Sequence, residues 1–227
     1  MIKKAMILAA GYGKRVHPLT LKTPKPLLKI GNNTLLSNTL KFIEKLGIKQ
    51  VVINVHYLGE QITDYINKNK FNLSINVVKE EDKILDTGGG ILNAIQHFSN
   101  EAFLVINPDT IWNDSYINSI DAMEKIYFER KMKNILLIVN NSTCFDKRFN
   151  GDFEIKNNVL LKEKINNFKY TGCQIFNKEL ILHKKLNYFP MSEIWDALLR
   201  ESKLYGYEHK GEFKHLTDFE IYEKLFI

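Results

Sequence analysis

Short apolar segments alternate with amphipathic segments through the first half of the chain. Ala5–Ala10 is a continuous apolar run and Val51–Val55 is rich in β-branched residues, which predicts buried strands. Apolar residues recur at helical spacing from Leu36 to Leu46 and stop at Gly47, which predicts an amphipathic helix. By the same criteria we expect strands at residues 5–10, 51–55, 74–78 and 102–106, and helices at 36–46, 58–66 and 91–98. This alternation predicts a Rossmann-like α/β fold, with a mostly parallel central sheet flanked by helices.

The second half of the chain has a less regular pattern. We expect helices near residues 116–130, 191–202 and 218–226, and strands at 134–139, 170–176 and 205–209. Asn157-Asn158 predicts the turn of a hairpin over residues 152–162. Because no repeat or low-complexity linker interrupts the pattern, we predict one domain over residues 1–227.

Composition and charge exclude several classes of protein. No apolar run approaches the roughly 18 residues that a membrane helix needs, so we expect no membrane partner. The net charge is +6, but basic and acidic residues are interspersed and no Lys/Arg stripe appears, so we expect no nucleic-acid partner either. A small anionic ligand would explain the basic balance equally well.

The cellular compartment is predicted from the N-terminus and the cysteines. The start resembles a signal peptide, but its apolar run is short and leads into Gly11-Tyr12-Gly13-Lys14-Arg15 rather than a cleavage site. Cys144 and Cys173 show no paired or metal-ligand spacing. We therefore expect a cytoplasmic protein.

Three Gly- or Asp-rich breaks are predicted at the carboxyl ends of strands, where α/β sheets bind ligands. They cover residues 11–14, 86–90 and 107–109. At the first break, Val16 replaces the third glycine of a dinucleotide fingerprint, and the spacing of a P-loop is absent. The glycines with Lys14 and Arg15 suit an anion, but taken alone this loop favours an ordinary turn with solvated basic residues.

The segment that follows contains three prolines. Pro18, Pro24 and Pro26 predict an ordered, non-helical loop, in which Lys25 is held between two prolines. A lysine fixed in this way suits a phosphate. The alternative is a surface loop whose prolines only restrict the unfolded chain.

The other two breaks, and one aspartate near the C-terminus, are each open to two interpretations. Gly88-Gly89-Gly90 suits either close approach by a base or sugar, or a flexible hinge. Asp109 follows a buried strand and suits Mg²⁺, although Pro-Asp is also common in turns. Asp218 precedes a predicted helix, where an N-cap is more common than a metal ligand.

Taken together, these motifs resemble the sugar-1-phosphate nucleotidyltransferases. The resemblance is carried by Ala9-Ala10-Gly11-x-Gly13-x-Arg15, Pro18-Leu19-Thr20 and Thr23-Pro24-Lys25-Pro26-Leu27, in this order and at this spacing. It continues strongly through residues 86–90 to about Asp109, and more thinly through Gly151-Asp152-Phe153 and Thr171-Gly172 to Asp218. The short length, the triple glycine and Gly151-Asp152-Phe153 are most similar to the members that use UTP and N-acetylmuramate 1-phosphate in cell-wall recycling. Other short members use mannose, glucose or heptose phosphates, or phosphocholine.

The resemblance implies a GT-A-like fold and a Mg²⁺-dependent enzyme that makes an NDP-sugar and pyrophosphate. It implies a nucleotide-binding part at residues 1–110 and a sugar-phosphate-binding part at 111–227, in a monomer or small homo-oligomer. The implied nucleotide-binding residues are Ala9, Ala10, Gly11, Gly13, Lys14, Arg15, Lys25, Gly88 and Gly89. The implied substrate-binding residues are Asn107, Asp152 and Gly172; the metal ligands are Asp109 and Asp218; the catalytic residues are Arg15, Lys25 and Asp109.

Two positions depart from the family pattern. Pro108 stands where the family usually has a glycine before the metal aspartate, and the Asp-x-Gly-Thr of the family becomes Asp218-Phe219-Glu220-Ile221. The departure puts the role of Asp218 as a metal ligand in doubt. It also leaves open a sugar-nucleotide-binding protein that has lost catalysis.

Overall fold

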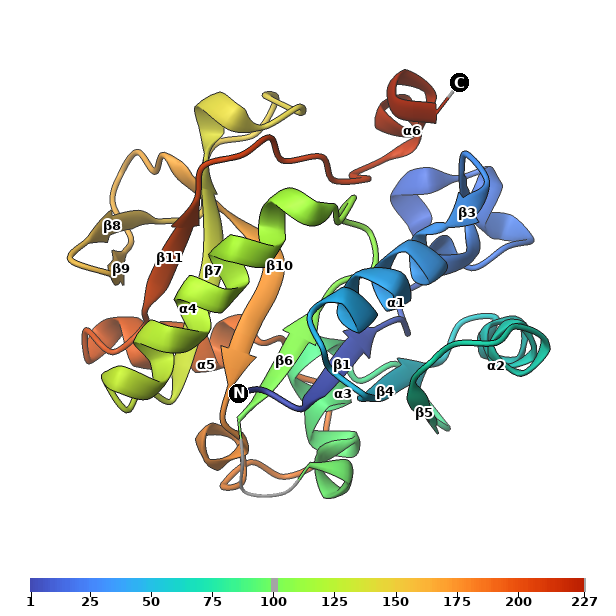
Figure 1. Ribbon diagram of the computed structural model, residues 1–227, viewed down its shortest axis with the longest axis horizontal. Coiled ribbons are helices and arrows are strands. Elements are labelled where there is room, and N and C mark those ends of the chain that lie inside the picture. Colours follow the sequence, from blue (N-terminus) through green and yellow to red (C-terminus); the bar gives the residue numbers. More distant parts are fainter. Residues whose placement is uncertain (99–101, 227) are drawn as a thin grey trace.

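The computed structural model describes residues 1–98 and 102–226, and its centre is a seven-stranded sheet (Figure 1). The strand order is β11-β7-β10-β6-β1-β4-β5. Their bounds are β1 Lys4–Leu8, β4 Gln50–Val55, β5 Ser74–Lys79, β6 Phe103–Ile106, β7 Asn134–Asn140, β10 Phe168–Phe176 and β11 Gly206–His209. Strand β10 runs antiparallel to β6 and β7, and the other neighbouring pairs are parallel. The predicted mostly parallel sheet is confirmed.

Helices cover both faces of the sheet. Because successive strand residues point to opposite faces, Ala5 and Ile7 of β1 pack in the cluster that holds α1, α2 and α4, whereas Met6 packs with α3 and α5. The helices are α1 Leu35–Lys45, α2 Gly59–Lys68, α3 Asp86–Asn93, α4 Ile117–Glu129, α5 Ser192–Arg200 and α6 Phe219–Phe226. Within the described residues, no helix is both long enough and apolar enough to cross a membrane.

Most of the predicted elements are confirmed, with ends that differ by a few residues. The hairpin is formed by β8 (Glu154–Lys156) and β9 (Val159–Leu161). Its turn residues Asn157 and Asn158 both have positive φ angles, of 52° and 65°. Two successive residues of this kind form the turn that matches the twist of a hairpin, and asparagine tolerates that conformation.

The loop after β1 corrects one prediction. We expected a non-helical segment, but it contains three short 3-10 turns, at Lys14–Val16, Leu19–Leu21 and Lys25–Leu27. Such turns need few hydrogen bonds, so they tolerate nearby prolines that would break an α-helix. A small hairpin, β2 (Lys29–Ile30) with β3 (Asn33–Thr34), then leads into α1.

The triple glycine corrects a second prediction. We expected a break over residues 86–90 before a helix that begins at Ile91, but α3 begins at Asp86 and contains all three glycines. A Cβ atom would lie 2.3 Å from the Phe189 ring at Gly88, and 2.3 Å from the Asn187 carbonyl oxygen at Gly89. Gly88 and Gly89 therefore allow α3 to pack against residues 187–189, Gly90 allows it to pack against Asn54 and Glu80, and none of the three forms a hinge or an open loop.

Replacing Gly88 with alanine is expected to destabilise the protein. Alanine in a helix is favoured by up to about 1 kcal/mol over glycine, but the clash with Phe189 costs about 1–3 kcal/mol. Urea unfolding measures the net loss. In a Phe189→Ala background the same substitution should cost less, and an equal cost in both backgrounds would contradict this packing role.

Candidate active site

A cavity of about 570 Å³ opens at the carboxyl ends of β1 and β6. These strands are neighbours and parallel, so the segments that follow them meet at one edge of the sheet. The predicted nucleotide-binding residues that line this cavity are Ala9, Ala10, Gly11, Gly13, Lys14, Arg15 and Lys25. Asn107 and Asp109 line it as well. We call this space the first cavity.

Gly88 and Gly89 do not lie among the residues that line the first cavity. Their neighbours Asp86 and Thr87 do, together with Tyr188. The backbone N–H groups of Gly88 and Gly89 both donate to the Phe189 carbonyl oxygen, at 3.0 Å each. In this structure the two glycines thus bind the segment that contains Tyr188, and they do not contact the cavity themselves.

Gly13 fixes the shape of the loop that follows β1. Its φ angle is 65°, and a Cβ atom there would lie 3.0 Å from Thr20 Cγ2 and 3.2 Å from Lys25 Cβ. The Thr20 hydroxyl donates to the Gly13 carbonyl oxygen at 2.8 Å. A Cβ atom at Gly11 would meet nothing within 4 Å. The loop is therefore held against the Lys25 segment at Gly13, while Gly11 leaves its backbone accessible.

Lys25, Asp109 and His215 form an ionic cluster at the first cavity. Lys25 Nζ lies 2.5 Å from Asp109 Oδ2, and His215 Nε2 lies 3.2 Å from the same oxygen. The Lys25 and Asp109 side chains are only 13% and 17% exposed. Burial acts to raise the pKa of Asp109, but the Lys25 ammonium and His215 outweigh it and hold that pKa well below its usual range. Asp109 is therefore a permanent anion braced by two partners.

The second oxygen of Asp109 bears on the expected Mg²⁺. Oδ1 is enclosed and has no hydrogen-bond partner among residues 1–98 and 102–226. No group of three or more His, Cys, Asp and Glu residues suited to a metal occurs in the part of the chain that the structure describes. Mg²⁺ is commonly held by one or two carboxylates together with substrate phosphates. Asp109 with its free oxygen fits that mode of binding.

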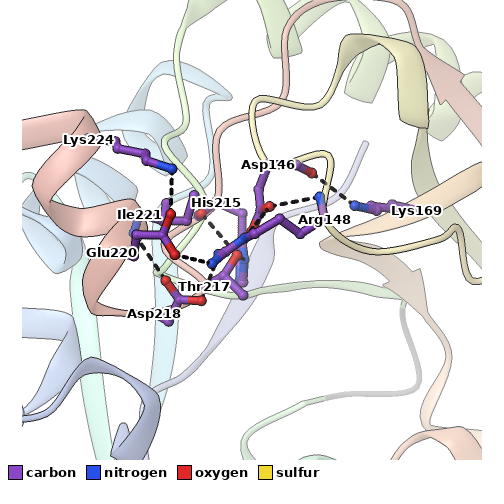
Figure 2. A network of polar contacts seen from close by, with 9 residues as sticks. All are labelled: Asp146, Arg148, Lys169, His215, Thr217, Asp218, Glu220, Ile221 and Lys224. Atoms are coloured by element: carbon purple, nitrogen blue, oxygen red, sulfur yellow. Dashed lines mark hydrogen bonds and ion pairs between the residues drawn. The ribbon is translucent and has the colours of Figure 1, made fainter.

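Asp218 is engaged by other residues (Figure 2). Its Oδ1 accepts a hydrogen bond from the Ile221 backbone N–H at 3.1 Å, so it caps α6. Its Oδ2 accepts from Arg148 Nη2 at 2.7 Å. Arg148 also binds the carboxylates of Asp146 and Glu220. The capping interpretation of Asp218 is confirmed, and its role toward Mg²⁺ stays a prediction.

A second cavity, of about 260 Å³, adjoins the first and shares Asn107 and Thr217 with it. The predicted substrate-binding residues Asn107, Asp152 and Gly172 all line this second cavity. Gly172 has a φ angle of 85°, and its carbonyl oxygen accepts from the Asn107 N–H at 2.7 Å. A Cβ atom at Gly172 would lie 2.9 Å from Asn107 Cβ. Glycine is thus required for the close contact between β10 and the end of β6.

Sequence reasoning missed three residues that the structure places here: Arg148, Lys169 and His215. His215 reaches Asp109 across 106 positions of sequence, and nothing local to it marks that pairing. Lys169 precedes the Tyr170–Phe176 segment that we expected as a strand, and β10 in fact begins at Phe168. That earlier start brings Lys169 into the sheet and its side chain to the second cavity.

A sheet of this topology, with a glycine loop, a Lys–Asp pair and two adjoining cavities, is typical of α/β proteins that bind phosphorylated ligands. The model of the nucleotidyl transferase family matches residues 4–145. Because the matched residues make up more than half of the chain, the chain belongs to that family.

The curated relatives and solved structures agree with this assignment. N-acetylmuramate alpha-1-phosphate uridylyltransferase of Caulobacter vibrioides is 25% identical, over 95% of this chain and 92% of that protein. The mannose-1-phosphate guanylyltransferase catalytic subunit beta of Drosophila melanogaster is 35% identical, over 92% of this chain and 58% of that protein. A UDP-glucose pyrophosphorylase solved with UDP-glucose is 18% identical and shares the fold, with a TM-score of 0.79 over 99% of this chain and 97% of that one.

Proposed function

We propose that the chain is a Mg²⁺-dependent uridylyltransferase that converts UTP and N-acetylmuramate 1-phosphate into UDP-N-acetylmuramic acid and pyrophosphate. Nucleotidyl transfer to a sugar 1-phosphate is the activity that its family and relatives support. The uridylyl and N-acetylmuramate specificity is supported by the similarity to the Caulobacter enzyme over nearly the full length of both chains. The observation that carries the proposal is the Lys25–Asp109–His215 cluster between two adjoining cavities.

The reaction needs charge neutralisation more than acid–base chemistry. A phosphate oxygen of the sugar 1-phosphate attacks the α-phosphorus in line, a new P–O bond forms, and the bond to the β-phosphate oxygen breaks to release pyrophosphate. A phosphomonoester has a second pKa near ~6 and is already largely dianionic at neutral pH. The first cavity would hold the nucleotide, and the second would hold the sugar.

The proposal gives a task to the glycine loop, to Lys25 and to the two aspartates. The backbone of the Gly11–Arg15 loop and the Arg15 guanidinium bind the β- and γ-phosphates that leave as pyrophosphate. Lys25, braced by Asp109, neutralises charge at the α-phosphate as the second anion approaches. Asp109, and Asp218 where Arg148 releases it, would hold Mg²⁺, which supplies charge neutralisation between the phosphates.

The test is an assay of pyrophosphate release over a panel of NTP and sugar 1-phosphate pairs, with product mass confirmed for each active pair. We expect turnover with UTP and N-acetylmuramate 1-phosphate, and loss of turnover when Mg²⁺ is chelated. Turnover that prefers another pair would reject the assigned specificity. A folded protein that is inactive with every pair would reject the enzymatic proposal itself.

Two specific observations favour alternatives. The 35% identity to the Drosophila guanylyltransferase favours GTP and mannose 1-phosphate as a second substrate pair. The occupation of Asp218 by Arg148 favours a sugar-nucleotide-binding protein that has lost catalysis. Calorimetry with UDP-N-acetylmuramic acid distinguishes the latter, because binding without any turnover would support it.

A further inference from the structure

Lys169 is a charged side chain that the protein encloses almost completely. It lies on β10, opposite Val139 of β7, and only 9% of it is exposed. Its ammonium donates to the Asp146 carbonyl oxygen at 3.1 Å and lies 5.8 Å from the centre of the Phe149 ring. Figure 2 shows the Lys169 side chain directed toward the Asp146 end of the Arg148 network. Lys169 is also one of the residues that line the second cavity.

The charge of Lys169 has no carboxylate partner within ion-pair distance among the described residues. The Asp146 carboxylate is taken by Arg148, at 2.8 Å. Asp152 lies on the same cavity, but its Oδ2 accepts from the Tyr170 N–H at 2.8 Å and forms no ion pair with Lys169. An ammonium has three donors, and one acceptor satisfies only one of them. Burying a cation that lacks a carboxylate partner and has unfilled donors costs free energy of folding, unless an anion binds it.

We propose that Lys169 determines sugar specificity by binding a carboxylate on the sugar 1-phosphate, so that the preferred substrates are acidic sugar 1-phosphates. This inference rests on the proposed function and refines it. The reacting phosphate has to lie beside Lys25 and Asp109, which line the first cavity only. Lys169 lines the second cavity only, so the anion that it meets is a different group of the same substrate.

The other walls of the second cavity suit the remainder of such a substrate. Tyr170, Phe149 and Phe213 supply apolar surface, and the exposed Asp152 supplies an acceptor for hydroxyl or amide groups. The volume of about 260 Å³ is slightly below the usual range for small-ligand pockets, which suits one sugar ring. A carboxylate at Lys169 would complete the hydrogen bonding of the ammonium.

The test compares two substrates that differ in one substituent. N-acetylmuramate 1-phosphate carries a lactyl carboxylate, and N-acetylglucosamine 1-phosphate lacks it. For Lys169→Met we expect KM for the acidic substrate to rise about 10- to 100-fold, as expected for one charge-assisted hydrogen bond. KM for the neutral substrate and kcat should change less than about threefold. Lys169→Arg should recover part of the preference, because it keeps the cation.

The matched control is Lys147→Met, an exposed lysine on the loop that covers Lys169, which should leave both KM values unchanged. Equal losses for the two substrates would assign Lys169 to a group that they share, and no loss would make it structural; either result overturns the inference. A wild-type enzyme that prefers neutral sugar 1-phosphates would also overturn it, while nucleotidyl transfer would stand.

Binding measurements keep the inference testable if no substrate pair turns over. Calorimetry should show that the wild type prefers UDP-N-acetylmuramic acid to UDP-N-acetylglucosamine, and that Lys169→Met loses this preference. Thermal unfolding of each variant verifies that it is folded. A preference that survives in Lys169→Met would overturn the inference, whatever the outcome of the activity panel.

Discussion

Replacing Lys25 with methionine is expected to lower kcat/KM for nucleotidyl transfer by about 10²–10³, the usual effect of removing one preorganised charge-stabilising donor. The structure gives the reason. The Lys25 side chain is only 13% exposed, its ammonium lies 2.5 Å from Asp109, and the residue lines the first cavity, so its charge is held in a fixed position there. Steady-state pyrophosphate release, with UTP and the sugar 1-phosphate varied separately, measures the effect.

Lys22→Met is the matched control for this variant. Lys22 lies on the same proline-rich loop, but it is exposed and does not line the first cavity. It should keep activity within about twofold of the wild type. Circular dichroism and thermal unfolding show whether Lys25→Met is folded, and a folded variant with wild-type kcat/KM would remove Lys25 from the mechanism.

Local patterns were enough to predict most of the fold. Strands β1 and β4 were predicted from apolar runs, α1 from a 3.6-residue repeat and the hairpin from Asn157-Asn158. Each of these patterns depends only on residues that are close in the sequence. The triple glycine was placed wrongly for the opposite reason. Gly88 and Gly89 are in close contact with residues 187–189, about 100 positions away, and no local pattern encodes that contact.

In the candidate site, too, the sequence predicted the local motifs but not the long-range contacts. The loop from Ala9 to Arg15 and Lys25 could be located from their order and spacing, since the glycines and prolines that shape the segment are part of the motif. The partners of the charged residues could not be located. That Asp109 pairs with Lys25 and His215, and Asp218 with Arg148, follows from which strand ends meet in the folded sheet.

Replacing Asp109 with asparagine is expected to lower turnover by at least about 10², since the variant removes the permanent anion at the centre of the cluster. It leaves the enclosed Lys25 ammonium without its carboxylate, and because asparagine has one oxygen and one NH₂ group, its side chain cannot both accept from Lys25 and offer an oxygen to Mg²⁺. Binding of Mn²⁺, followed by electron paramagnetic resonance in the presence of UTP, should weaken at least tenfold. Asp114→Asn is the control, because the Asp114 carboxylate is 68% exposed and pairs only at the surface with Lys45.

The Asp218 variants decide whether one carboxylate or two bind the metal. If Asp218 is a ligand, Arg148 competes with the metal for it, so Arg148→Met should tighten Mn²⁺ binding severalfold and Asp218→Asn should weaken it. If Asp218 only caps α6, then Arg148→Met leaves Mn²⁺ affinity unchanged. Asparagine is as good an N-cap as aspartate, so a loss of Mn²⁺ affinity in Asp218→Asn would not come from a lost cap. Unchanged affinity in both variants would leave Asp109 as the metal-binding carboxylate and contradict the ligand role of Asp218.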